Sequence, residues 1–399
     1  MIQYKSKKQA QICIGITMFI FASFSTAYIQ LTSSILAFII ETEGYTDPIL
    51  SNMIVTISSL AQIPACLLGV FLGKRMNKKF WCFIGIVSFA AGGLLNIPFS
   101  GSLTMVLALR LVVGFGSGMV TLLYTAFLPD FFEGKSLSMM LGLATSGGGF
   151  WGFVFSSLAA AVCDTHGWKA AYLLHLYAVI PLILLILLVP GKPLVTLPES
   201  RETRKRKLAP MIFWYSFLGG LLYMGVQVLW SNTSIWVRDT LSGTAAQMGI
   251  VSGMFSIFSC GARLIFGPIY SRMKEKTLCL SLVLLAAGLF LASGAQSIGM
   301  SLVAASLVGA SMGLTAPACL NLSIRADPEN QVAAQAITTI GFASGQFTST
   351  YWRAAVGVLF DGTLVGTFRI SGYAAVFLLA FLTLWTVAPK RKKKLRESQ

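Results

Sequence analysis

The chain has 399 residues, of which 55% are hydrophobic and 11% are charged, and its mean hydropathy is +0.76. Soluble domains carry about 25% charged residues, so this composition excludes an ordinary soluble protein. Apolar runs of 18 or more residues recur along the chain, which predicts an all-α membrane protein. The Lys and Arg residues that produce the net charge of +16 lie mostly between these runs. They therefore indicate membrane topology rather than nucleic-acid binding.

Twelve apolar segments predict twelve transmembrane helices. The first six are expected near 11–40, 49–73, 80–98, 102–126, 137–162 and 168–190, and the last six near 211–237, 246–270, 277–296, 299–322, 332–359 and 367–388. The polar stretch between them is rich in Lys and Arg. We therefore predict an N-terminal six-helix bundle over 1–190, a cytoplasmic linker over 191–210, and a C-terminal six-helix bundle with a basic tail over 211–399.

The basic residues are divided unevenly between the two sides of the membrane. Of the 30 Lys and Arg, 24 lie on the side that holds both termini, and only Lys169, Arg238 and Arg369 lie on the other. Because Lys and Arg concentrate in cytoplasmic loops, both termini are predicted to be cytoplasmic, and we expect a multi-pass protein of the plasma membrane. The basic run at 390–396 is expected to contact anionic lipids.

Features of the first half recur in the second at a nearly constant spacing of 197 or 198 positions. Such a repeat predicts two pseudo-symmetric halves, and transporters built in this way bind substrate near the midplane between the repeats. The matching pairs are Gly69 and Gly267, Gly116 and Gly313, Asp130 and Asp327, Ser146 and Ser344, and Asp164 and Asp361.

Four short motifs follow one another along the chain. Residues 69–79 read Gly-Val-Phe-Leu-Gly-Lys-Arg-Met-Asn-Lys-Lys, and residues 267–272 read Gly-Pro-Ile-Tyr-Ser-Arg. Residues 110–118 read Arg-Leu-Val-Val-Gly-Phe-Gly-Ser-Gly, and residues 164–169 read Asp-Thr-His-Gly-Trp-Lys. Closely spaced glycines let helices approach one another in lipid. The basic residues of the loops can latch a gate or simply set the topology.

In order and spacing these motifs resemble those of the major facilitator superfamily, over nearly the full length of the chain. Gly73 and Ser271 stand where the family's loop motif has an acidic residue. The resemblance implies the twelve-helix fold of that superfamily and a secondary transporter in which two bundles rock around a central site. It assigns gating or structural roles to Gly69, Lys74, Arg75, Arg110, Gly114, Gly118, Asp164, Gly267 and Arg272.

Enzyme signatures are missing from the sequence. There are only two histidines, and no glycine-rich nucleotide loop is present, so we expect no metal, no cofactor and no catalytic residues. All fourteen Asp and Glu fall in loops or at helix ends, whereas Arg110, Arg263 and Arg353 lie within helices. A cavity with net positive charge favours an anion, and a carboxylate can meet a guanidinium with two parallel hydrogen bonds.

The internal repeat does not account equally for the positions of the three arginines. Arg110 belongs to a family motif, so a structural or gating role competes with substrate contact. Arg263 has Cys66 at the matching position of the first half, so the shared architecture does not account for it. Placing a charge at bilayer depth costs about 2.5 to 3.5 kcal/mol, and we expect Arg263 to bind substrate; a helix-end carbonyl partner is the alternative. Arg353 is also unmatched, and pairing near the outer surface competes with ligand binding.

The segment from Gly261 to Gly267 is similar to helix 8 of the oxalate:formate antiporter and monocarboxylate transporter group. In that group an Arg at this place binds the substrate carboxylate. Monocarboxylate transporters have an Asp where this chain has Ser259, and the oxalate:formate group has a Lys near the place of Gln346. The resemblance thus implies a carboxylate at Arg263 and leaves proton coupling and a second cation unassigned.

Polar and aromatic residues in the middle of predicted helices are further candidates for the binding site. Tyr and Trp offer rigid walls with one polar group each, and packing between helices is the alternative for every one of them. The substrate-binding candidates in addition to Arg263 and Arg353 are Tyr28, Gln62, Tyr124, Gln227, Trp230, Asn321 and Gln346.

The sequence therefore predicts a monomeric secondary transporter for a small organic anion that carries a carboxylate. The absence of a carboxylate within the helices favours exchange or facilitated diffusion over proton coupling. Efflux of drugs or other amphipathic compounds is the alternative, although Ser146-Gly-Gly-Gly-Phe150 has no proline of the kind found in the efflux motif. A membrane sensor that transports nothing is the alternative from another class.

Overall fold

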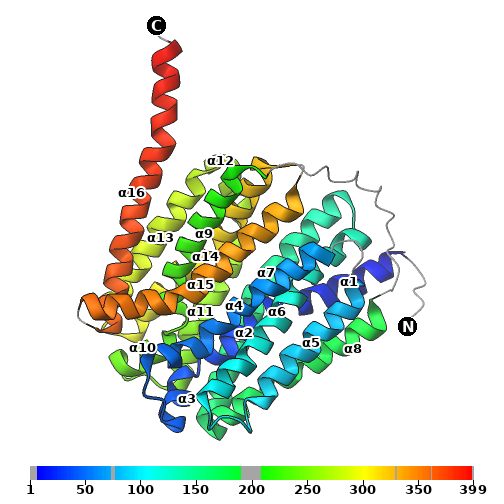
Figure 1. Ribbon diagram of the computed structural model, residues 1–399, viewed down its shortest axis with the longest axis vertical. Helices are drawn as coiled ribbons and strands as arrows, with labels where there is room; N and C mark the ends of the chain where they lie inside the picture. Colours follow the sequence, from blue (N-terminus) through cyan, green and yellow to red (C-terminus); the bar gives the residue numbers. More distant parts are fainter. Residues whose placement is uncertain (1–6, 73–76, 190–207, 329, 361, 398–399) are drawn as a thin grey trace.

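The computed structural model describes residues 7–72, 77–189, 208–328, 330–360 and 362–397, and these residues form helices and short connections without a strand (Figure 1). The first half contains α1 (Lys7–Phe21), α2 (Phe24–Ser33), α3 (Leu36–Glu43), α4 (Pro48–Leu72), α5 (Lys78–Leu95), α6 (Leu103–Phe131), α7 (Gly134–Tyr172), η2 (Leu173–Ala178) and α8 (Val179–Leu188). The second contains α9 (Pro210–Trp230), α10 (Thr233–Leu241), α11 (Ala245–Leu264), α12 (Phe266–Met273), α13 (Lys276–Ser293), α14 (Ile298–Ala326), α15 (Gln331–Leu359) and α16 (Leu364–Glu397).

These helices account for twelve crossings of a membrane. Within the described residues, ten segments are long and apolar enough to span it. One of them, Ser146–Leu188, supplies two crossings because Gly167 has a φ of 82° and breaks α7. The remaining crossing is α15, which is less apolar because it carries several Thr, Ser and Gln side chains and one Arg. The predicted all-α fold with twelve membrane helices is confirmed.

Two of the predicted helices, 11–40 and 211–237, are broken at equivalent places. The backbone at Ile35 has φ −123° and ψ 7°, and the backbone at Asn232, 197 positions later, has φ −107° and ψ 9°. Serine hydroxyls account for both breaks, since Ser34 Oγ donates to the Gln30 carbonyl at 2.8 Å and Ser231 Oγ donates to the Gln227 carbonyl at 2.7 Å. Such bonds compete with the helical ladder. The prediction of continuous helices is therefore wrong here.

The predicted helix 246–270 is also divided, between α11 and α12. The break falls at Ile265, whose φ is −92° and ψ is 4°. It lies directly after Arg263-Leu264, so the arginine occupies the last turn of a helix rather than the middle of one. The side chain is thereby placed close to the C-terminal carbonyl groups of α11, where a positive charge is favoured.

Glycines hold the helices of each half in close contact. A methyl group at Gly114 of α6 would lie 1.9 Å from the Ser58 carbonyl oxygen of α4, and one at Gly309 of α14 would lie 2.0 Å from the Phe255 carbonyl oxygen of α11. Only glycine permits such an approach. Gly114 and Gly309 are 195 positions apart, whereas their contact residues, Ser58 and Phe255, are 197 positions apart.

The difference between 195 and 197 positions also corrects one predicted pair of the repeat, Gly116 and Gly313. Gly313 packs on Ser259 of α11, and the residue of the first half with the corresponding contact is Gly118, which packs on Gln62 of α4. Gly116, which the constant spacing pairs with Gly313, faces Gly85 of α5 instead. The halves therefore match with a register change of two residues in α6 and α14.

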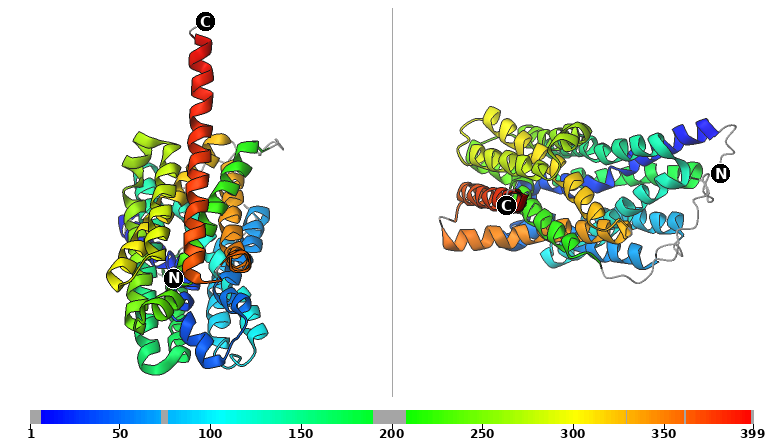
Figure 2. Two further views of the ribbon diagram at one scale, coloured as in Figure 1. Left: turned by 90° about the vertical axis from the view of Figure 1, so that its left-hand side faces the viewer. Right: turned by 90° about the horizontal axis from the view of Figure 1, so that it is seen from above.

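The two halves lie side by side, as the view from above shows (Figure 2). They are joined along the pairs α7–α11 and α4–α15. Hydrogen bonds between them gather from the middle of the molecule to the end that holds α3 and α10, at the bottom of Figure 1. This seam, here called the α3/α10 seam, is formed by Tyr28 with Gln346, Gln30 with Ser252 and Ser256, Ser33 and Ala37 with Ser234, Glu41 with Arg238, Asn52 with Asn232, and Thr56 with Thr350.

Candidate functional site

Arg263 is half-buried near the end of α11, at the junction of the two halves. Its charge acts on the hydroxyl of Tyr124 from α6 and on the hydroxyl of Tyr223 from α9. Both tyrosines are nearly buried, at 3% and 5% exposure. The two tyrosines come from opposite halves, and a guanidinium offers several hydrogen-bond donors to one ligand.

A second group of predicted residues meets beside this arginine. The Tyr28 hydroxyl of α2 donates to Oε1 of Gln346 in α15 at 3.0 Å, and the side chain of Gln62 in α4 lies near the same hydroxyl. Tyr28 lies within electrostatic reach of Tyr223 as well. The structure therefore brings five predicted residues and Tyr223 into one region, here called the central cluster: Tyr28, Gln62, Tyr124, Tyr223, Arg263 and Gln346.

Tyr223 is a member of the central cluster that sequence reasoning missed. It lies one helical turn before Gln227 on α9, and its ring stacks on that of Phe342 of α15 with centroids 4.4 Å apart. Trp230 on the same face stacks on Phe255 of α11 at 4.8 Å. The signal that could have found Tyr223 is its helical spacing from the two α9 residues that were predicted.

Two predicted residues make bonds that do not reach the central cluster. Asn321 donates its amide to the Pro317 carbonyl of its own helix at 2.9 Å. Arg353 donates to Oδ1 of Asn232, and Asn52 of the first half donates to the same oxygen at 2.8 Å. Arg353 thus takes part in the α3/α10 seam at the level of the helix break.

Arg110 is fully buried and binds the backbone rather than other side chains. Its Nε donates to the Ile54 carbonyl of α4 at 2.8 Å, and its Nη2 donates to the Tyr28 carbonyl of α2. The Ser58 hydroxyl returns a bond to the Arg110 carbonyl at 3.0 Å. These bonds tie α6 to two helices and hold the backbone of Tyr28 in place.

Of the remaining motif residues, Gly118 packs on Gln62 of the central cluster, and the other described ones lie at helix contacts, at a turn or on the surface. Gly114 and Gly118 pack on α4, Gly69 lies within that helix, and Asp164 is exposed just before the turn at Gly167. Gly267 faces open space and Arg272 is exposed on α12, while Lys74 and Arg75 lie outside the described residues. Among the residues that are described, no group of three His, Cys, Asp or Glu side chains could hold a metal ion.

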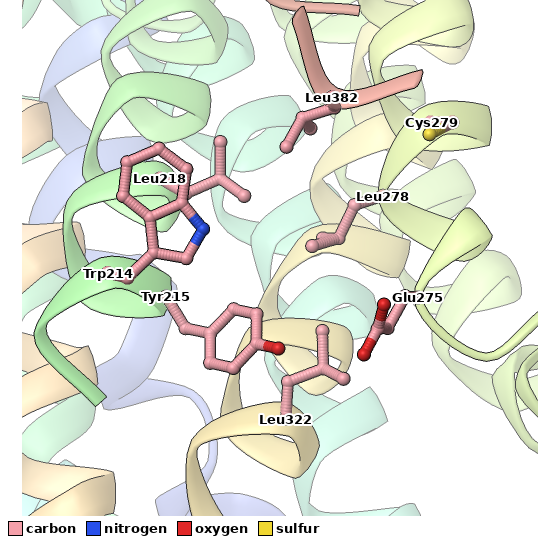
Figure 3. Close-up of a pocket in the computed structure, with 8 residues that line it drawn as sticks. All are labelled: Trp214, Tyr215, Leu218, Glu275, Leu278, Cys279, Leu322 and Leu382. Atoms are coloured by element: carbon pink, nitrogen blue, oxygen red, sulfur yellow. The ribbon is translucent and has the colours of Figure 1, made fainter. Parts of the chain in front are cut away.

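Two hollows elsewhere in the molecule are unsuited to an organic anion. The pocket in Figure 3 lies between α9, α13, α14 and α16 and has a volume of about 30 Å³, which holds about one or two water molecules. The Glu275 carboxylate at its wall would repel an anion. A larger groove of about 490 Å³ on α4 and α6 is lined only by apolar residues such as Pro64 and Phe115, and it suits lipid chains.

Comparisons with known proteins agree on one kind of molecule. The model of the Major Facilitator Superfamily matches residues 11–350 and 215–399. A bacterial homologue of the human lysosomal transporter Spinster, solved inward-facing and unoccupied, has 12% identity and a TM-score of 0.71, with 94% of this chain and 95% of that chain covered. A POT family transporter in complex with 5-aminolevulinic acid has 11% identity and a TM-score of 0.75, with the same coverage of 94% and 95%. No curated protein matches the chain.

Proposed function

The chain belongs to the Major Facilitator Superfamily and is a membrane transporter rather than an enzyme, and from that premise we propose that it carries a small organic anion with a carboxylate group. The observation that carries the proposal is the place of Arg263. Its guanidinium lies where the two halves meet, within electrostatic reach of Tyr124 of one half and of Tyr223 of the other. A ligand held there contacts both halves at once, which is what coupling of binding to their relative movement requires.

The charge of the site selects the class of substrate. The sequence places all fourteen carboxylates in predicted loops or at predicted helix ends. The positive charge of Arg263 disfavours a cationic substrate, whereas a carboxylate can accept two parallel hydrogen bonds from a guanidinium. The Tyr124 and Tyr223 hydroxyls can donate to the same carboxylate, and the Phe342 ring covers the apolar side of the site.

Alternating access supplies the mechanism. The α3/α10 seam closes one end of the molecule, so in this state exchange with the solution takes place at the opposite end. Movement of the substrate to the other side requires the bonds of the seam to break and the halves to close at the linker end. A bound anion lowers the energy of the closed intermediate by neutralising Arg263, and exchange of one anion for another is the favoured mode because no helix interior holds a carboxylate for a proton.

The solved POT family transporter supports the size of the substrate. It is a complex with 5-aminolevulinic acid, a small carboxylic acid. At 11% identity the two proteins share their fold and not their specificity. The comparison therefore indicates that a fold of this kind accommodates a small ligand with a carboxylate group, and we infer that the choice of anion depends on the central cluster.

Counterflow in liposomes tests the proposal. Purified protein is reconstituted with an unlabelled acid inside, and entry of labelled acetate, butyrate or succinate is followed. We expect Arg263→Gln to lower the rate at least tenfold for the acid that wild type transports, since the variant keeps a donor but loses the charge. Arg369→Gln, which removes an exposed charge on α16, is the matched control.

The possible results separate the functions considered. Unimpaired counterflow in Arg263→Gln contradicts the proposed role of that residue. Transport of neutral or cationic amphipathic compounds but of none of the acids identifies efflux instead. Acids that stabilise the protein against heat, without any flux, identify a sensor.

A further inference from the structure

We propose that Gln227 is a specificity-determining residue, which selects anions carrying a neutral hydroxyl or amide group at a distance from the carboxylate. The proposal rests on the proposed function, because it takes Arg263 as the place of the carboxylate. It goes further by assigning a second polar contact to the substrate. The substrate class then becomes a small carboxylate with a neutral polar group at its other end.

The strongest observation is the contrast between Gln227 and its counterpart in the first half. Gln30 lies 197 positions earlier, and both side chains have 0% exposure. Both precede a helix break by the same spacing, and the carbonyl of each accepts a serine hydroxyl. The two residues therefore occupy equivalent places at the same depth.

Their amide groups are satisfied very differently. The Gln30 amide donates to Ser256 Oγ, and its Oε1 accepts from Ser252 Oγ at 2.8 Å. Both the Nε2 and the Oε1 of Gln227 are buried without a hydrogen-bond partner among the described residues. Most buried polar side chains have a partner, and an exception needs an explanation. A ligand that is not bound in this state supplies one.

Gln227 also faces the right direction to meet such a ligand. Gly225 packs on Leu285 of α13, so the opposite face of α9 is turned toward α11 and α15. Gln227 lies on that face together with Tyr223 and Trp230, whose rings stack on α15 and α11 respectively. Tyr223 lies within electrostatic reach of Arg263, and Gln227 is four residues further along α9, which is a rise of about 6 Å.

This geometry determines what the second group of the substrate must be. A primary amide donates and accepts at the same time, so it complements a hydroxyl, an amide or another group with both functions. A second carboxylate would satisfy only its donor, and an alkyl chain would satisfy neither atom. The rise of about 6 Å along α9 matches a chain of roughly three methylene groups between the carboxylate and the neutral group.

Three acids and two matched variants test the proposal by calorimetric binding to the purified protein. 4-Hydroxybutyrate has its hydroxyl at the far end, butyrate has none, and 2-hydroxybutyrate has it beside the carboxylate. For wild type we expect 4-hydroxybutyrate to bind about tenfold more tightly than the other two acids. In Gln227→Met, which keeps the length of the side chain but removes both polar atoms, the three affinities should become equal.

Thermal unfolding without ligand separates this role from a structural one. Gln227→Met removes an unsatisfied amide from the interior, so its melting temperature should stay the same or rise. Gln30→Met removes bonds that are made, so its melting temperature should fall while the tenfold preference for 4-hydroxybutyrate remains. A lower melting temperature in Gln227→Met together with an unchanged preference would overturn the inference.

Arg263→Gln distinguishes failure of the inference from failure of the proposed function. Equal binding of all three acids by wild type, with binding lost in Arg263→Gln, overturns the role of Gln227 and leaves the carboxylate at Arg263. Binding that is the same in wild type and Arg263→Gln, or no binding of any acid to wild type, overturns both.

Discussion

Arg110 and Arg263, two arginines of the membrane helices, have different surroundings. Arg110 binds the Ile54 and Tyr28 carbonyls, so its place is defined by backbone from two other helices. Arg263 lies in the last turn of α11 beside two tyrosine hydroxyls. The backbone bonds of Arg110 position the fold, whereas Arg263 is the residue that we propose to meet a ligand.

Replacement of Arg110 by Lys tests its structural role. An ammonium group cannot reach two carbonyls in the geometry of a guanidinium, so Arg110→Lys should destabilise the protein by about 3 kcal/mol through the loss of charged hydrogen bonds. Thermal unfolding in detergent measures the effect, with Arg369→Lys as the control on an exposed arginine. Unchanged stability with loss of anion binding would instead make Arg110 a binding residue.

At the scale of helices, glycine contacts set how closely the elements approach. A methyl group at Gly345 of α15 would lie 2.0 Å from the Gly220 carbonyl oxygen of α9, whereas one at Gly261 of α11 would have no atom within 4 Å. At Gly345 the neighbouring atom belongs to the backbone of α9, which cannot move aside without a large cost in free energy. At Gly261 no atom opposes a methyl group, so only helix propensity matters, and it favours Ala over Gly by about 1 kcal/mol.

Alanine at these two glycines should therefore change stability in opposite directions. Gly345→Ala forces α9 and α15 apart and should cost about 2 kcal/mol or more, while Gly261→Ala should stabilise by up to about 1 kcal/mol. Unfolding temperatures of the two variants provide the comparison. Equal effects would mean that α9 and α15 are not in the close contact described.

The break between α9 and α10 carries the acceptor on which the seam depends. Asn232→Leu removes the oxygen that binds Arg353 and Asn52, leaving a buried charge without that bond. The substitution should destabilise the closed state of the seam relative to the open state by about 2 kcal/mol. This shifts the equilibrium between the two states about thirtyfold toward opening. Asn321→Leu is the control, because the Asn321 amide bonds only a carbonyl of its own helix.

Thiol labelling measures this opening. A cysteine at position 56 lies in the seam, since Thr56 Oγ1 is 2.6 Å from Thr350 Oγ1. An impermeant maleimide added at the α3/α10 side should modify Thr56→Cys faster in the Asn232→Leu background than in wild type or Asn321→Leu. The same rate in all three backgrounds would show that Asn232 does not hold the seam closed.

At the scale of the whole molecule, one end is closed by bonds between the halves. Thr56 and Thr350 come from opposite halves, so a disulfide between Thr56→Cys and Thr350→Cys should form on oxidation and keep this end shut. Transport should then stop and should recover with a reductant. The control is a pair within the second half, where Ser281 Oγ and Ser311 Oγ lie 3.0 Å apart. A disulfide between cysteines at these two positions should leave the rocking movement intact.

The sequence was sufficient for the fold and for most of the central cluster, because apolar length and repeat spacing are local properties of the chain. Tyr28, Gln62, Tyr124, Arg263 and Gln346 were all named from their positions in helices. The breaks at Ile35, Asn232 and Ile265 were missed, since hydrophobicity continues through them while serine hydroxyls and backbone angles decide the geometry. Arg353 bonds Asn232, which also accepts from Asn52 of the other half, and no sequence spacing reports such contacts.

The exposed ion pair at the end of the seam has a consequence for the origin of the chain. Arg238 Nη1 lies 3.1 Å from Glu41 Oε2, and the two residues are 197 positions apart, so they occupy the same place in the two repeats. In a twofold dimer of identical subunits, a residue beside the axis meets its own copy. Identical halves would therefore bring two like charges together, and an attractive pair at this place exists only once the halves are encoded separately and have diverged.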